Sequence, residues 1–113
     1  MTHPTPFGVR IAGTGSAVPS KVLTNADLEG KFDTSDAWIV KRTGIRERRL
    51  IDPSKGESAF SLERDSILAA LDAAGIDASE LDLLIVASLT SEMRCPSNAC
   101  RISEAIGAQC AGA

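Results

Sequence analysis

The chain has 113 residues, 43% of them hydrophobic and 24% charged, which is an ordinary globular composition and excludes a disordered protein. A formal net charge of −3 gives no basic excess for nucleic acid, and no run of about 18 apolar residues is present to cross a membrane. The start lacks a secretory-signal pattern, and the three cysteines contain no C-x-x-C pair. We therefore expect a cytoplasmic protein with no metal site and with neither nucleic acid nor membrane as a partner.

The first elements surround a Gly-x-Gly sequence. After a loose lead-in over residues 1–7, residues 8–12 predict a strand that runs into Gly13-Thr14-Gly15-Ser16. A dinucleotide-binding loop would need a third small residue where Val18 and Pro19 stand. We therefore favour a tight turn that uses the backbone freedom of glycine. A short helix is expected next, over residues 22–29, with Thr24 as its N-cap.

Residues 34–49 carry the only tryptophan, Trp38, and five of the 12 basic residues. The pattern predicts a short helix, capped by Thr34 or Ser35 and ended by Gly44, followed by a strand over residues 45–51. An aromatic ring among guanidinium groups suits a ligand that is flat and anionic, such as a phosphorylated nucleotide. The basic residues are Lys41, Arg42, Arg46, Arg48 and Arg49.

The second half predicts two helices around an apolar strand. The helices run from residue 58 to 74 and from Pro96 to the glycine at 107, and the face of the first is expected to be core. Residues 83–87 are uniformly apolar, as in a parallel-sheet strand covered on both faces. This order indicates an α/β fold with parallel crossovers, and the chain resembles the front of a larger domain because such a strand needs neighbours on both edges.

The cysteines alone do not complete an active site. A catalytic cysteine needs a base, and the only histidine, His3, lies in the lead-in. Cys110, which precedes small residues, is the candidate nucleophile by composition. Cys100 is expected to be an inert core residue and Cys95 a packing or pocket-lining residue.

Several sequence strings together resemble the N-terminal part of β-ketoacyl-[acyl-carrier-protein] synthase III, the initiating condensing enzyme of bacterial fatty acid synthesis. The similarity runs over nearly the whole chain from residue 8 onward. Its most specific part is Thr34-Ser35-Asp36-x-Trp38-Ile39-Val40-x-Arg42-Thr43-Gly44-Ile45-Arg46-Glu47-Arg48, with further matches at Ile11–Ser16, Val22–Leu28, Leu84–Ala87 and Pro96–Cys100.

The resemblance implies a thiolase-like α/β fold of two similar halves, assembled as a homodimer. A cysteine would be acylated by an acyl-CoA such as acetyl-CoA and would then condense with malonyl-acyl carrier protein, with loss of CO₂ and help from a histidine and an asparagine. By position, Trp38 would stack on the adenine of coenzyme A, and Thr34 and Arg42 would contact its nucleotide end. Arg46 would meet the acidic carrier protein. Coenzyme A is a substrate here, and no cofactor is expected.

The resemblance also predicts where the catalytic cysteine would lie relative to this chain. The family nucleophile follows a Phe-Asp strand, and in this register Ala113 falls just before that strand. Cys110 shares a Cys-Ala-Gly triplet with the nucleophile motif but stands in the wrong register. We therefore expect residues 8–113 to be an incomplete thiolase-like domain, truncated before the catalytic cysteine. The alternatives are a non-catalytic fragment that binds coenzyme A and a related condensing enzyme, either a polyketide starter synthase or a hydroxymethylglutaryl-CoA synthase.

Overall fold

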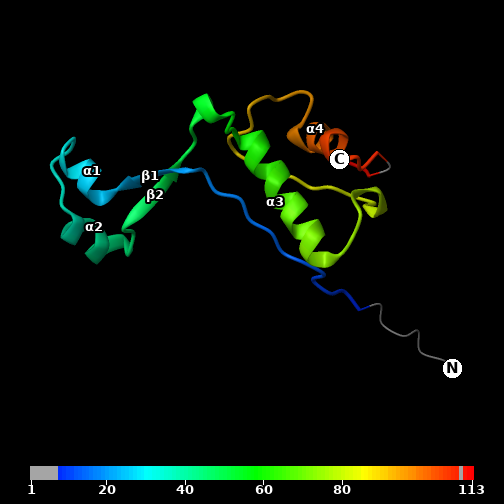
Figure 1. Ribbon diagram of the computed structural model, residues 1–113, viewed down its shortest axis with the longest axis horizontal. Helices are drawn as coiled ribbons and strands as arrows, with labels where there is room; N and C mark the ends of the chain where they lie inside the picture. Colours follow the sequence, from blue (N-terminus) through cyan, green and yellow to red (C-terminus); the bar gives the residue numbers. More distant parts are fainter. Residues whose placement is uncertain (1–7, 110) are drawn as a thin grey trace.

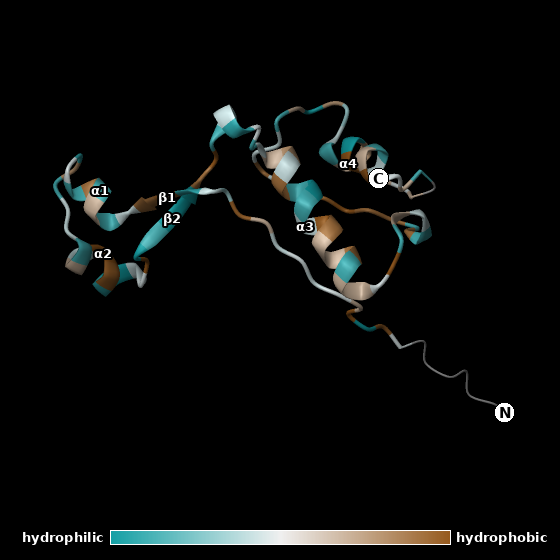
Figure 2. Cartoon of the chain, in the orientation of Figure 1, coloured by the Kyte–Doolittle hydropathy of each residue, from teal (hydrophilic) through white to brown (hydrophobic). Residues whose placement is uncertain are grey.

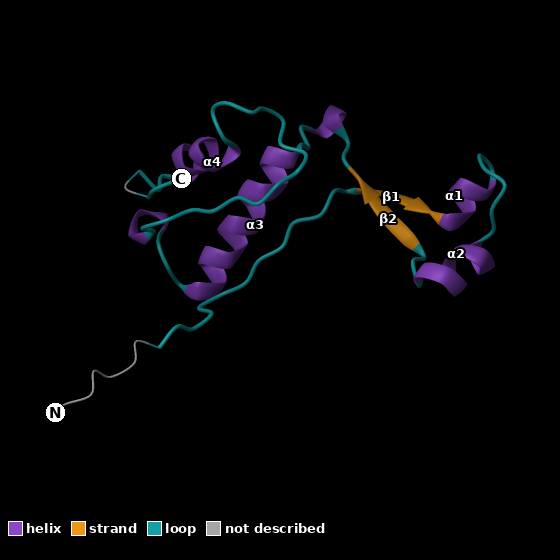
Figure 3. Cartoon of the chain, turned by 180° about the vertical axis from the view of Figure 1, so that it is seen from behind, coloured by secondary structure: helices purple, strands orange, loops and turns teal. Residues whose placement is uncertain are grey.

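The computed structural model describes residues 8–109 and 111–113 (Figure 1). This part of the chain is elongated, with principal extents of 67 × 38 × 26 Å, because its elements gather in two groups. We call residues 20–50 the hairpin unit and residues 58–113, without residue 110, the α3–α4 unit. Residues 8–19 are extended and run along the helix α3 (Ala59–Ala74) towards the hairpin unit, as the opposite views of Figures 1 and 3 both show.

Two strands and two helices form the hairpin unit. Strand β1 (Lys21–Thr24) pairs antiparallel with β2 (Glu47–Leu50), residue for residue along their whole length. The helices α1 (Asn25–Glu29) and α2 (Asp36–Thr43) lie between the strands in sequence and at one end of the ribbon in space (Figure 3). The strand predicted over residues 45–51 is therefore confirmed in its centre.

Local capping chemistry sets the ends of these helices. The Thr24 hydroxyl accepts the Asp27 N–H at 3.3 Å, and the Asp27 carboxylate accepts the Thr24 N–H at 2.8 Å, which is the predicted capping box. Ser35 caps α2, and Gly44 ends it in a left-handed conformation with φ of 71°. The predicted start of the first helix at residue 22 is wrong, because the two residues before Thr24 pair with β2 instead.

The α3–α4 unit joins two helices that begin and end where the sequence predicts. Ser58 caps α3 and Gly75 ends it with φ of 65°. Ser97 caps α4 (Asn98–Ile106) and Gly107 ends it with φ of 81°. Short 3-10 turns, Pro53–Lys55 and Ala78–Glu80, lie in the connections.

The small core of this unit lies beside α4 rather than along α3. Ile102 and Ala108 are 0% exposed, and Leu84 and Ala99 are 8% exposed. No residue of α3 is fully buried, and Leu68 on its predicted core face is 43% exposed. The expectation that this face is core is therefore met only in part, because residues of the described chain cover it incompletely.

The apolar segment at residues 83–87 differs from its prediction. Leu84 is buried, but Leu83 and Ile85 are 62% and 78% exposed, so only one face of the segment is covered. Figure 2 shows the segment as a largely hydrophobic stretch of extended chain. Its pairing is a single parallel bridge between Leu83 and Gly112, in which the Leu84 N–H donates to the Gly112 carbonyl at 2.8 Å. The prediction of a strand covered on both faces is wrong here, because no further layer of the described chain lies on the other side.

The Gly-x-Gly segment is also neither a strand end nor a turn. Gly13 and Gly15 are part of the extended segment that crosses α3, and residues 8–12 pair with no strand among the described residues. A Cβ added at Gly13 would lie 2.6 Å from the Ala70 carbonyl oxygen and 2.7 Å from the Ala74 nitrogen. Glycine is needed here because the two backbones touch, and not because of a left-handed φ.

The described elements form a mixed α/β architecture, as expected, with antiparallel pairing in the hairpin unit and one parallel bridge in the α3–α4 unit. Among the helices of the described residues, none has both the length and the apolar character needed to cross a membrane.

Candidate functional site

Helix α2 presents an aromatic ring and a guanidinium group together. The hydroxyl of the N-cap Ser35 accepts the Trp38 N–H at 3.2 Å and so fixes the first turn. The Arg42 guanidinium, four residues later on the same face, lies 4.6 Å from the centroid of the Trp38 ring. Trp38 remains 54% exposed, so the indole has surface left for a further stacking partner.

A cavity of about 360 Å³ opens beside this pair at the start of α2. Asp33, Thr34, Ser35 and Trp38 line it. Thr34 is half-buried, and its backbone N–H donates to the Phe32 carbonyl at 2.9 Å. Its side-chain hydroxyl makes no hydrogen bond to the other described residues. The cavity therefore joins an aromatic face to polar groups, among them the Asp33 carboxylate.

The five basic residues of this stretch do not act as one cluster. Arg48 turns inward and donates to the Asn25 side chain at 2.9 Å, and Arg49 lies 3.8 Å from Glu47 in an exposed ion pair. Lys41 and Arg46 are exposed. Of the predicted anion-binding groups, only Arg42 is brought against Trp38.

The cysteines of the described chain lie on its surface. Cys95 and Cys100 are both free and exposed, so the prediction of Cys100 as a core residue is wrong: it follows the α4 cap, and the Ser97 hydroxyl lies 3.2 Å from its sulfur. Cys110 and His3 lie outside the described residues. Within the described residues, no cluster of three or more His, Cys, Asp and Glu side chains could hold a metal ion.

A second cavity, which the sequence analysis did not predict, lies under the loop between residue 87 and α4. It has a volume of about 470 Å³ and polar walls. The signal for it was the polar loop that follows an apolar segment, since ligands of α/β folds bind beyond the carboxyl ends of the strands. Its lining includes Val86, Ser88, Leu89, Ser91, Met93, Arg94, Ser97, Asn98 and Ala99.

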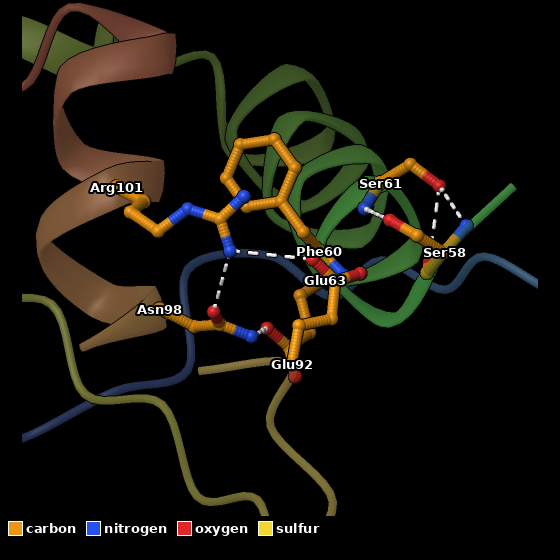
Figure 4. A network of polar contacts seen from close by, with 7 residues as sticks. All are labelled: Ser58, Phe60, Ser61, Glu63, Glu92, Asn98 and Arg101. Atoms are coloured by element: carbon orange, nitrogen blue, oxygen red, sulfur yellow. Dashed lines mark hydrogen bonds and ion pairs between the residues drawn. The ribbon is translucent and has the colours of Figure 1, made fainter. Parts of the chain in front are cut away.

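A polar network holds this loop against both helices (Figure 4). The Arg101 guanidinium stacks 4.4 Å from the Phe60 ring centroid and donates to Asn98 at 3.0 Å and to Glu92 at 3.3 Å. Asn98, only 3% exposed, donates to Glu63 at 2.9 Å. Glu92 in turn accepts the Phe60 N–H at 3.2 Å at the start of α3. The network therefore fixes the loop at one point on each helix.

This arrangement favours the ionised form of Glu92. Hydrogen bonding from the Ser58 side chain, then from the Phe60 N–H, lowers the pKa of Glu92 below its ordinary value of 4.5, and Arg101 adds to the effect. Burial acts in the opposite direction but is outweighed. The Glu92 carboxylate therefore accepts a backbone N–H in the first turn of α3, and it stays ionised to lower pH than a free glutamate does.

The chain matches curated proteins over most of its length. It is 48% identical over 98 residues to β-ketoacyl-[acyl-carrier-protein] synthase III of Caldanaerobacter subterraneus subsp. tengcongensis, and 48% identical over 103 residues to that of Desulfotalea psychrophila. These matches span 87% and 91% of this chain. The chain is homologous to part of β-ketoacyl-[acyl-carrier-protein] synthase III. It spans only 29% and 31% of those two relatives. No family model matches the chain.

Solved structures agree with this relation to synthase III. The 3-oxoacyl-[acyl-carrier-protein] synthase III from Aquifex aeolicus is 42% identical with a TM-score of 0.86, over 92% of this chain and 33% of that one. The priming β-ketosynthase of the R1128 polyketide pathway is 33% identical with a TM-score of 0.85, over 91% of this chain and 30% of that one. The chain therefore has the thiolase-like fold of the condensing enzymes over this segment, as the sequence predicts.

Proposed function

We propose that this chain is the N-terminal, coenzyme A-binding segment of a β-ketoacyl-[acyl-carrier-protein] synthase III that works in the cytoplasm. The observation that carries the proposal is the half-exposed Trp38 ring beneath the Arg42 guanidinium, at the rim of a cavity that Thr34 lines. The homology to synthase III supports the enzyme class.

In this proposal α2 holds the nucleotide end of an acyl-CoA. The adenine stacks on Trp38, where an aromatic face is worth about 1–3 kcal/mol per base. Arg42 supplies a permanent positive charge and several donors for phosphate oxygens, and Thr34 supplies a hydroxyl. The exposed Arg46 contacts the acidic carrier protein, and the working enzyme is a homodimer.

The reaction itself would occur on groups that the described residues do not contain. A cysteine thiolate attacks the acyl-CoA thioester and releases coenzyme A as a thiolate. Malonyl-acyl carrier protein then loses CO₂, and the resulting enolate attacks the acyl-enzyme, which frees the cysteine and gives the β-ketoacyl product. Since these steps need a positioned base, residues 1–113 alone are expected to have neither transacylase nor condensing activity.

Calorimetric titration of the complete gene product with coenzyme A and with pantetheine, which lacks the nucleotide, tests the proposal. Trp38→Ala should weaken coenzyme A binding by roughly 5- to 150-fold, the equivalent of about 1–3 kcal/mol, and leave pantetheine binding unchanged. Trp38→Phe should retain more of the affinity because it keeps an aromatic face. Wild-type protein that does not bind coenzyme A, or Trp38→Ala protein that binds it normally, would refute the proposal.

A second candidate is a priming synthase of a polyketide pathway, which the similarity to the R1128 priming β-ketosynthase favours. Both candidates use an acyl-CoA and a carrier protein, so the nucleotide site does not separate them. Steady-state rates with acetyl-CoA and with longer acyl-CoA thioesters do. A strong preference for acetyl-CoA supports fatty acid initiation, and a preference for longer acyl groups supports the second candidate.

A further inference from the structure

Asn25 is the most buried polar residue of the hairpin unit, with 1% of its surface exposed. Its side-chain amide donates to the Asp36 carboxylate and to the Ile45 carbonyl, each at 2.8 Å. Its side-chain oxygen accepts from Arg48 at 2.9 Å. Its backbone N–H donates to the Arg46 carbonyl at 3.2 Å. One asparagine therefore joins α1, both ends of α2 and the strand β2.

Arg48 is directed into this junction and not to solvent. One of its terminal nitrogens is bonded to Asn25, and the other, Nη1, is buried without a hydrogen-bond partner in the described chain. A buried donor without a partner has lost its hydration, so the inward position of Arg48 must be offset by its other contacts. The neighbouring Arg49 lies on the exposed side, with 42% of its side chain accessible.

The two donor bonds of Asn25 bracket the helix that carries the stacking pair. Asp36 is the first residue of α2, and Ile45 follows the glycine that ends it. The Asp36 N–H is also held by the Glu29 carboxylate at the end of α1. Because an eight-residue helix fixed at both ends can neither tilt nor rotate freely, these bonds determine where Trp38 points.

The same bonds affect the charge of the cavity. Asp36 is absent from the cavity lining, although its neighbours Asp33, Thr34 and Ser35 all contribute to it. Its carboxylate is engaged by Asn25 instead. Asp33 already lines the cavity, and a second carboxylate released into it would add to the repulsion of phosphate groups, so the asparagine keeps this further negative charge away from an anionic ligand.

We propose that Asn25 and Arg48 are positioning residues that hold α2 so that Trp38 and Arg42 can receive the adenine nucleotide of coenzyme A, an inference that rests on the proposed function. Neither residue touches the ligand. Their effect is transmitted through the orientation of α2 and the restraint of Asp36.

The test exchanges the two partners in the complete gene product. Asn25→Asp places a carboxylate against Asp36 and against the Ile45 carbonyl, so coenzyme A affinity should fall about tenfold or more while pantetheine affinity stays constant. In the double variant N25D/D36N the donor stands at position 36 and the acceptor at position 25, and Arg48 keeps its acceptor. This variant restores the bond between positions 25 and 36 but leaves the Ile45 carbonyl facing a carboxylate, so it should recover part of the affinity, a rescue that general destabilisation would not produce.

A ligand-free readout makes the result independent of coenzyme A. With 5-fluorotryptophan incorporated, the ¹⁹F resonance assigned to Trp38 by its loss in Trp38→Phe should shift or broaden in Asn25→Asp and move back towards its wild-type position in the double variant. The matched pair Arg48→Gln and Arg49→Gln provides the control, and only Arg48→Gln should change the resonance and the affinity. This pair also decides the question if Asn25→Asp does not fold.

The possible failures are distinct. If the wild-type protein binds no coenzyme A, the proposed function fails, and the Trp38 resonance alone decides whether the pair positions α2. If it binds coenzyme A and folded Asn25→Asp and Arg48→Gln proteins bind it equally well with an unchanged resonance, the inference is overturned.

Discussion

The hairpin unit and the α3–α4 unit contain similar short helices and extended segments, yet they are stabilised in opposite ways. In the hairpin unit the strands pair with each other, and a buried asparagine joins the surrounding elements. In the α3–α4 unit the extended segments beside α3 share one bridge and expose Ile85 and Leu89. The first unit joins its elements through buried polar contacts, although Arg48 Nη1 has no partner in the described chain, whereas the second leaves an apolar surface open. Trp38 and Arg42 are therefore held together in the unit with buried polar contacts, while the other unit keeps apolar side chains exposed.

The largest expected effect concerns the core of the α3–α4 unit. Ile102→Ala should lower the free energy of unfolding by about 2–5 kcal/mol, because a fully buried side chain is removed. Chemical denaturation of residues 1–113 measures the loss. Ile85→Ala, at a site that is 78% exposed, should change stability by less than about 0.5 kcal/mol. If the two variants lost equal unfolding free energy, the Ile85 side chain would have to be buried and not exposed.

The next effect tests the contact between the N-terminal segment and α3. Gly13→Ala should cost about 1–3 kcal/mol, because the new Cβ would overlap the backbone of α3 at Ala70 and Ala74. Thermal unfolding measures the cost. Gly30→Ala is the matched control in the hairpin unit: its Cβ meets nothing within 4 Å and its φ is −73°, so we expect no loss. A neutral Gly13→Ala would contradict the close backbone contact.

The independence of the two units is tested at their helix caps. Thr24→Ala and Ser58→Ala each remove one capping box and should each cost about 1 kcal/mol. Hydrogen exchange locates the loss. Thr24→Ala should speed exchange in α1 alone, and Ser58→Ala should do so in the first turns of α3. Faster exchange in both units from either variant would show that they unfold together.

The smallest effect is the acid sensitivity of the loop network. Because folding lowers the pKa of Glu92 below 4.5, its contribution to stability is present above that pH and is lost as the pH falls through the folded-state value. Glu92→Gln should therefore flatten the decline of melting temperature on acidification. Glu104→Gln, a change at an exposed glutamate of α4, is the control. If Glu92→Gln leaves the pH dependence of the melting temperature unchanged, the ionised carboxylate of Glu92 does not contribute to stability through this network.

What the sequence predicts best is chemistry that acts within a few residues. The Thr24 capping box, the glycine helix ends and the four-residue spacing of Trp38 and Arg42 follow from local geometry, and the structure confirms them. The roles of Thr34, Arg42 and Arg46 in binding remain predictions.

What the sequence does not predict is contact between distant segments. Asn25 follows a helix cap and resembles an ordinary exposed helix residue, but its partners lie 11 to 23 residues away. Likewise, the apolar run at residues 83–87 indicates burial on both faces, but the pattern does not reveal whether other described residues pack against each face.

The contact of Gly13 and Gly15 with α3 has an entropic consequence. It joins two glycines to a row of small residues, Ser66, Ala70 and Ala74, spaced one turn apart. Glycine and alanine lose no rotamer freedom on burial, so the segment is ordered at the cost of its backbone alone. The neighbouring Val9 and Ile11, 98% and 85% exposed, retain the freedom of their side chains. Burying these side chains would cost little conformational entropy, since a branched aliphatic side chain loses rotamer freedom equivalent to about 0.5–1 kcal/mol on burial.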